Sequence, residues 1–104
     1  MLNDKYIVTY LSSFADDLNQ IADYISEVLG NPIAASAFVD SVEQAILERQ
    51  TCASAFAPYP SKKKRINPYY YIPVGNYLIF YVLINDVMEV RRIIYGARNM
   101  DTEL

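Results

Sequence analysis

The sequence predicts an α+β domain in which a helical hairpin packs on a β-sheet built mostly from the C-terminal half. Residues 5–11 alternate like a strand, and residues 13–50 carry apolar side chains at helical spacing. Residues 69–95 read as three strands joined by tight turns. Hydrophobic residues make up 53% of the 104 residues, which is enough for a core, and we expect one domain over residues 1–104.

The first strand is expected at Lys5–Leu11, where aromatic and β-branched residues are frequent. Ser12 ends this strand, and Ser13 with Asp16 three residues later resembles a capping box at a helix start. The helix that follows carries one apolar stripe, formed by Phe14, Leu18, Ile21, Ala22, Ile25 and Leu29. Gly30 is a natural stop, because glycine adopts the left-handed backbone that ends many helices.

A second helix is expected to begin at Asn31 and Pro32, since asparagine caps helices and proline suits their first position. It should end near Gln50. Its apolar stripe is formed by Ala35, Phe38, Val42, Ala45 and Ile46. The short turn between the helices predicts an antiparallel hairpin. Residues 51–68 contain three prolines and four consecutive bases, so we expect a connecting loop with a basic end.

Three strands are expected at Tyr69–Val74, Tyr77–Ile84 and Val87–Tyr95, forming an antiparallel meander with the first strand at an edge of the sheet. Both faces of Tyr77–Ile84 are apolar, which predicts a central strand covered on both sides. One face must take the helical hairpin. The other is either covered by loop and tail or left as a tyrosine-rich concave surface. Asn99–Leu104 reads as a short polar tail.

The charge is divided unevenly along the chain. Residues 1–50 hold two basic and eight acidic residues, whereas residues 51–104 hold seven basic and four acidic ones. This division indicates either a basic working face on an acidic scaffold or helices that carry solvated acids. Cys52 is the only cysteine and there is no histidine, so no zinc site and no metal or organic cofactor is expected. A cytoplasmic protein with no signal peptide and no membrane span fits these features.

Three segments, taken in their order along the chain, resemble segments of a known protein family. They are DDLNQIADYI at Asp16–Ile25, NPIAASAFV at Asn31–Val39 and the stretch Val74–Asn99. The first two resemble the helical hairpin of RelE/ParE toxins, and the third resembles the last two strands of that family. The family's terminal motif V-x-R-I-x-x-G-x-R-D is matched, apart from Asn99 in its last position, by Val90, Arg92, Ile93, Gly96 and Arg98.

This resemblance implies the toxin of a bacterial type II toxin–antitoxin system, partnered by a cognate antitoxin protein. The ParE-like branch of the family inhibits DNA gyrase by binding it, and the RelE-like branch cleaves messenger RNA in the ribosomal A site. A decayed relative that only pairs with its antitoxin is a third reading. We favour the ParE-like reading, with the RelE-like endoribonuclease as the alternative.

An RNA-cleaving site needs positive charge at the phosphate and groups that move protons. Without histidine, such a site would use Arg98, Arg65 and Tyr95. Arg98 follows the last expected strand, where toxins of this family present a functional arginine, although it could instead pair with Asp101 or Glu103. Two departures weaken the nuclease reading: no arginine follows the aromatic residue at position 77, and residues 99–104 contain no aromatic residue.

Candidates for binding a target or RNA are Lys62, Lys63, Lys64, Arg91 and Arg98. The lysine run reads equally well as a solvated loop. Arg91 and Arg92 are neighbours in a strand, so we expect them on opposite faces, with Arg92 beside Met88, Val90 and Ile94. One of the two arginines should pair with a helix acid such as Asp17, and the sequence does not decide which.

Overall fold

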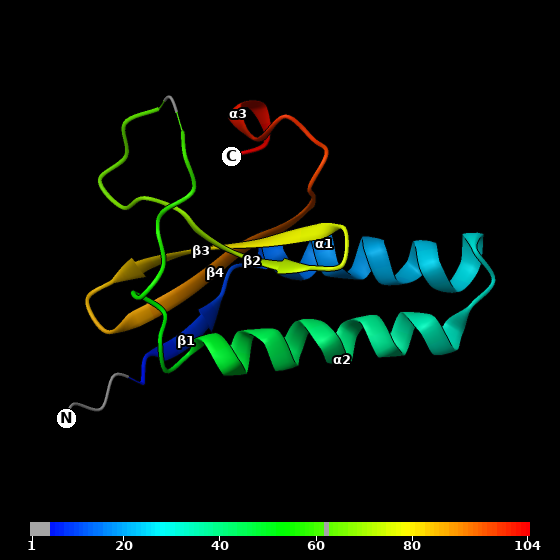
Figure 1. Ribbon diagram of the computed structural model, residues 1–104. Coiled ribbons are helices and arrows are strands. Elements are labelled where there is room, and N and C mark those ends of the chain that lie inside the picture. Colours follow the sequence, from blue (N-terminus) through cyan, green and yellow to red (C-terminus); the bar gives the residue numbers. More distant parts are fainter. Residues whose placement is uncertain (1–4, 62) are drawn as a thin grey trace.

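Helices and sheet form two layers, as the computed structural model of the chain shows (Figure 1). The structure describes residues 5–61 and 63–104, so Lys62 lies outside the described residues. The elements are β1 (Ile7–Tyr10), α1 (Ser12–Asp23), the π-helical turn η1 (Tyr24–Val28), α2 (Pro32–Arg49), β2 (Tyr70–Val74), β3 (Tyr77–Ile84), β4 (Val87–Tyr95) and α3 (Met100–Glu103). The predicted order of strands and helices is confirmed, and the short helix α3 is additional.

The helical hairpin ends and restarts where its turn residues predict. Gly30 has a φ of 65°, and the Asn31 side chain accepts a hydrogen bond from the backbone N–H of Ala34 at 3.0 Å. The capping box expected at Ser13 is wrong, because Leu11 is the N-cap and makes no side-chain cap bond. The Ser13 hydroxyl instead donates to the backbone oxygen of Arg91 at 2.7 Å, which ties the start of α1 to the sheet.

The four strands lie in the order β1-β4-β3-β2. The antiparallel meander of β2, β3 and β4 is confirmed, and β1 occupies an edge as predicted, but it runs parallel to β4, so the sheet is mixed. The central position of β3 is also confirmed. Its middle residues Ile79, Phe80, Tyr81 and Val82 are all fully buried, alternately on one face and the other.

A β-bulge interrupts the pairing of β3 with β4. Phe80 lies opposite Arg92 but Tyr81 lies opposite Val90, so Arg91 has no partner across the ladder. The expectation that Arg91 and Arg92 alternate strictly is therefore wrong, because one extra residue breaks the period of two. Val90 belongs to the core beneath the helices, together with Met88, whereas Ile94 packs in the cluster on the other face.

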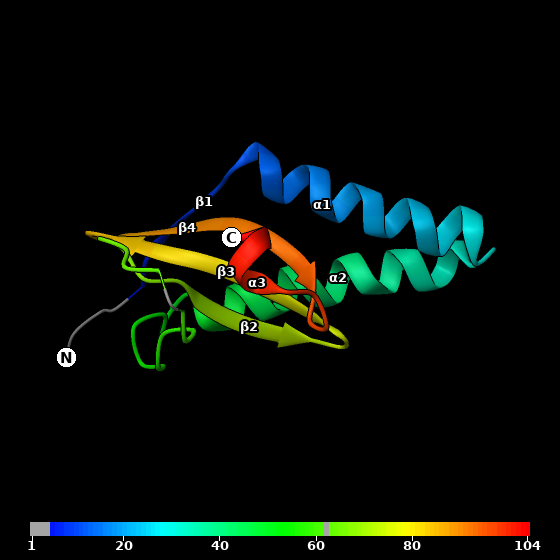
Figure 2. The same cartoon turned by 90° about the horizontal axis from the view of Figure 1, so that it is seen from above.

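The second face of the sheet is covered by the loop and the tail, which decides between the two sequence-based alternatives. Tyr69, Phe80 and Met100 form the centre of this smaller core, and Tyr59 and Leu104 pack around it. The tail is thus not simply polar: Met100 is only 5% exposed. Figure 2 shows α3 on the side of the sheet away from α2.

A buried arginine fastens the 51–56 segment to the sheet. The Nη1 atom of Arg49 donates to the Tyr71 carbonyl at 3.0 Å and to the Tyr81 hydroxyl at 2.9 Å. That hydroxyl donates in turn to the Ala53 carbonyl at 2.7 Å, and the Phe56 ring lies 3.5 Å from the guanidinium carbon. Burial raises the pKa of Tyr81, although Arg49 acts in the opposite direction. This network also satisfies a carbonyl on the outer edge of β2.

Candidate functional site

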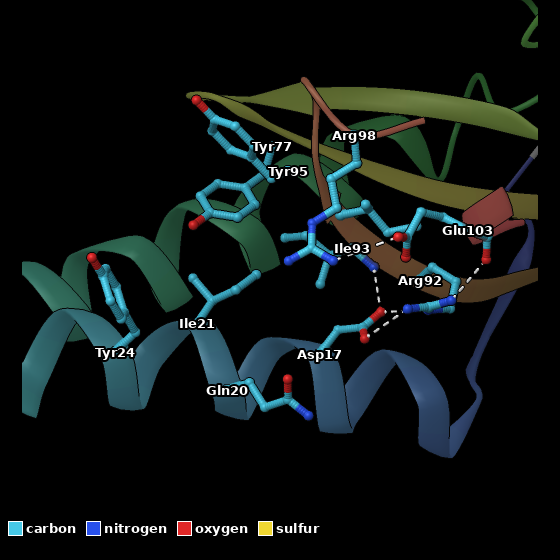
Figure 3. Close-up of a pocket in the computed structure, with 11 residues that line it drawn as sticks. Asp17, Gln20, Ile21, Tyr24, Tyr77, Arg92, Ile93, Tyr95, Arg98 and Glu103 are labelled. Carbon is cyan, nitrogen blue, oxygen red and sulfur yellow. Dashed lines mark hydrogen bonds and ion pairs between the residues drawn. The ribbon is translucent and has the colours of Figure 1, made fainter. Parts of the chain in front are cut away.

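An open groove of about 560 Å³ lies between α1, the end of β4 and the C-terminal tail. Figure 3 shows its two kinds of side chain. Tyr24, Tyr77 and Tyr95 make an aromatic wall, and a group of charged residues lies beside it. The groove forms at this end of β4 because β1 pairs only with Val87–Val90, which leaves the rest of the strand for α1 and the tail to flank.

The aromatic wall is built by the register of the last hairpin. Tyr77 begins β3 and lies directly opposite Tyr95 at the end of β4, with the two rings edge-to-face at 5.7 Å. The Tyr77 ring also packs edge-to-face against the Phe38 ring of α2, with the ring centroids 5.2 Å apart. Tyr95 is 45% exposed and Tyr24, from η1, is 50% exposed. The wall therefore offers two large accessible rings on a packed base.

A bidentate ion pair forms the floor of the groove. The Asp17 carboxylate accepts from Nε of Arg92 at 2.7 Å and from its Nη2 at 3.1 Å. The same carboxylate accepts the backbone N–H of Ile93 at 3.1 Å, and Nη1 of Arg92 donates to the Glu103 carbonyl at 3.0 Å. Hydrogen bonding to Asp17 raises the pKa of Arg92 above its ordinary value. The expected ion pair between one of the two arginines and a helix acid is confirmed, and the structure shows that the arginine is Arg92. The pair fixes α1 and the tail to β4.

Arg98 is presented to solvent by a tight turn after β4. The N–H of Gly96 donates to the Asn76 carbonyl at 2.8 Å, and a Cβ at Gly96 would come within 3.2 Å of that same oxygen. The turn leaves the Arg98 side chain 61% exposed. Its Nη1 lies 3.5 Å from a carboxylate oxygen of Glu103, a long contact that is weak at an exposed site. The guanidinium is therefore available at the mouth of the groove.

The groove carries balanced charge. Of the described residues, two arginines and two acids line it: Arg92 with Asp17, and Arg98 with Glu103. Such a surface differs from a phosphate-binding groove, which concentrates uncompensated positive charge.

The other predicted site residues lie elsewhere. Arg65 and Arg91 both flank Tyr69, with their guanidinium carbons 4.8 Å and 5.8 Å from its ring, and neither lines the groove. Lys63 and Lys64 are exposed on the loop before them, and Lys62 falls outside the described residues. The structure thus brings Arg98 together with Tyr95 and separates both from Arg65.

Sequence reasoning missed Tyr24 and Tyr77 as groove residues. The hairpin turn at Gly75 and Asn76 fixes the pairing of Tyr77 with Tyr95, so the register could have revealed the first of them. Tyr24 gave no such signal, because it lies outside the apolar stripe of its helix and its exposure depends on the hairpin's position.

A helical hairpin on a mixed four-stranded sheet, with an exposed arginine after the last strand, agrees with the class of RelE/ParE-like toxins that the sequence resembles. The sequence matches a family model described as the ParE toxin of the type II toxin–antitoxin system parDE over residues 8–100. The chain therefore belongs to the ParE toxin family and is the toxin component of such a module, whose other component is an antitoxin.

A solved structure agrees with this assignment at the level of the fold. It is a chain of the chromosomal ParDE system of P. aeruginosa, with a TM-score of 0.72 and 18% sequence identity over 88% of this chain and 97% of that chain. A search of curated proteins finds no match. Within the described ranges, no helix is long and apolar enough to cross a membrane.

Proposed function

We propose that this toxin acts by binding a protein target, DNA gyrase, through the groove that contains Arg98, rather than by cleaving RNA. The observation that carries the proposal is an exposed arginine beside two exposed tyrosines in a groove of balanced charge. Arginine and tyrosine are among the residues that most often dominate protein–protein binding energy. Gyrase is proposed as the target because the sequence resembles the ParE-like branch of the family, and that branch inhibits DNA gyrase.

The alternative, a ribosome-dependent ribonuclease, has less support. It would need Arg98, Arg65 and Tyr95 around one phosphate, but Arg65 stacks on Tyr69, outside the groove. Asp17 and Glu103 offset the positive charge of Arg92 and Arg98, so the groove has no net charge that would attract a phosphate. With no histidine in the sequence, the groove also offers no side chain that titrates near neutral pH without a large pKa shift.

The antitoxin is expected to neutralise the toxin by covering the Arg98 region with an amphipathic segment that runs along the helical hairpin or the groove. Tyr24 lies on the hairpin and lines the groove as well, so a single segment can touch both surfaces. A complex in which Arg98 stays open while the toxin is inactive would argue against such masking. Both gyrase and the antitoxin as partners imply a cytoplasmic site of action.

The test combines a gyrase supercoiling assay with mapping of transcript ends from translating ribosomes. The purified chain should inhibit supercoiling and leave transcripts uncut. Arg98→Ala should weaken inhibition about tenfold or more, the usual size of effect at a dominant interface residue. Lys5→Ala is the charge-matched control, because Lys5 precedes β1, which pairs with the start of β4, whereas Arg98 follows the end of β4.

Three outcomes separate the readings. Inhibition that depends on Arg98 supports the gyrase proposal. Codon-phased cuts that vanish in Arg98→Ala would establish the ribonuclease instead. A chain that is inert in both assays but still binds its antitoxin would establish the decayed relative.

A further inference from the structure

The two outer edges of the sheet differ in how their backbone groups are paired. On the β2 edge, Arg49 donates to the Tyr71 carbonyl, and the N–H of Tyr59 donates to the Tyr69 carbonyl at 2.7 Å. Pro73 lies in the same strand and has no N–H to offer. Features of this kind prevent an edge strand from pairing with another chain. The β2 edge is therefore protected.

The β1 edge lacks this protection. The N–H groups of Ile7 and Leu11 each donate at 2.9 Å to a carbonyl on the β4 side of the strand. Because successive residues of a strand direct their backbone groups to opposite sides, those of Val8 and Tyr10 point outward, away from β4. No group in the described part of the chain pairs with them. The helix α1 packs on β4, and Figure 2 shows β1 at the rim of the sheet.

The open stretch of this edge is short and uncharged. It is bounded on one side by Tyr6, whose N–H donates to the Gln50 carbonyl at 3.1 Å and whose carbonyl accepts from the Gln50 amide at 2.7 Å. On the other side it is bounded by Ser12, where α1 begins. Between these limits no charged residue or proline occurs, and Ile7 and Tyr10 are 56% and 52% exposed. Charges and prolines are what usually discourage edge pairing, so this stretch can accept another strand.

The open stretch is complementary to a second copy of itself. In an antiparallel pair with Thr9 opposite Thr9, Val8 lies opposite Tyr10 of the other copy, and Ile7 lies opposite its Leu11. Val8 and Tyr10 carry the outward backbone groups, so each such pair can exchange both hydrogen bonds, and Thr9 lies on the two-fold axis. Apolar residues then face apolar residues, and threonine faces threonine, which are favourable pairs across strands.

The limits of the stretch agree with the same register. Tyr6 falls opposite Ser12 of the other copy, so pairing ends in both chains where the Gln50 contact and α1 begin. We propose that the β1 edge is a homodimer interface, through which two copies join their sheets by antiparallel pairing of β1. The interface is small, so half-association is expected at roughly 10–100 μM. This dimer does not depend on gyrase being the target.

Sedimentation velocity of the full chain tests the dimer. The wild type should pass from monomer to dimer between about 5 and 500 μM. Thr9→Lys and Thr9→Glu each place like charges opposite one another on the axis, so each should raise the dissociation constant about tenfold or more. An equimolar mixture of the two variants should recover near wild-type association, because a lysine then faces a glutamate. Thr102→Lys makes the same change at an exposed position of α3 and should alter the constant about twofold or less.

Cross-linking tests the register. In a Cys52→Ser background, Thr9→Cys places two Cα atoms about 4.5 Å apart across the axis, a separation that a disulfide can bridge. This variant should therefore form a covalent dimer under mild oxidation. Ile7→Cys in the same background lies four residues from its own copy, about 13 Å away at about 3.4 Å per residue, and should cross-link at least about tenfold more slowly.

Three results would overturn the proposal. The first is a wild-type chain that stays monomeric at about 500 μM. The second is equal association of Thr9→Lys and Thr102→Lys, which would place the dimer contact elsewhere. The third is cross-linking of Ile7→Cys as fast as Thr9→Cys, which would exclude the symmetric register. Urea unfolding verifies the fold of each variant, and recovery in the mixture shows that lost association is not misfolding.

Discussion

Replacing Asp17 by Ala should destabilise the fold more than any other single change of an acid on α1. The substitution removes two hydrogen bonds to Arg92 and one to the backbone N–H of Ile93. A hydrogen bond to a charged group contributes about 1.5–3 kcal/mol when buried. The two side chains are 28% and 16% exposed, so solvent screens part of this energy, and we expect a total loss of about 3 kcal/mol.

This loss is measured by urea unfolding at 25 °C. With a slope of about 1–3 kcal/mol per molar urea, the midpoint should fall by about 1–3 M, and the melting temperature by about 10–20 °C. The control is Asp16→Ala, an exposed neighbour that should change the stability by about 0.5 kcal/mol or less. A double-mutant cycle with Arg92→Ala should give a coupling energy of about 1–2 kcal/mol.

Two results would refute this reasoning. If Asp17→Ala costs no more than Asp16→Ala, the bidentate pair does not stabilise the junction of α1 with β4. If the cycle gives no coupling, the loss comes from some cause other than the contact between the two side chains.

Three further predictions concern the core, the turn and the groove. Stability should fall as pH rises above about 10. The folded state keeps Tyr81 protonated, whereas the unfolded chain ionises this tyrosine and so binds fewer protons. In alkaline unfolding curves, Tyr81→Phe should make the fall of stability with pH shallower. Gly96→Val should lower the stability by about 1–3 kcal/mol, because its Cβ meets the Asn76 carbonyl at 3.2 Å; a melting temperature within 2 °C of wild type would contradict this. Tyr24→Ala should weaken gyrase inhibition with little change in urea midpoint, since the ring is half exposed, and a large loss of stability would show that the ring is structural instead.

Most of the fold could be predicted because local signals agree with tertiary packing. The turn residues Gly30, Asn31 and Gly75 adopt the backbone or cap geometry that their residue types favour, and the apolar runs became the buried strands. The parallel pairing of β1 with β4 could not be predicted, because a strand's own pattern does not encode the direction of its neighbour. The helix α3 was missed because only Met100 and Leu104 are apolar in that segment.

The site was predicted in part. Arg98 and Tyr95 share the groove, since both depend on the end of β4, which the sequence marks clearly. Arg65 was grouped with them as a hypothetical nuclease residue, but in the structure it lies beside Tyr69, outside the groove. The path of the loop that carries it has no local signature in the sequence. The bulge at Arg91 likewise depends on how β3 and β4 pair, so periodicity within one strand could not reveal it.

The central claim, that the Arg98 groove is the surface that engages the target, is tested most directly by equilibrium binding of the purified chain to purified gyrase. Arg98→Ala and Tyr95→Ala should each weaken the affinity about tenfold or more, whereas Lys5→Ala should bind like wild type. Wild-type affinity in both groove variants, with their folds intact by urea unfolding, would contradict the claim.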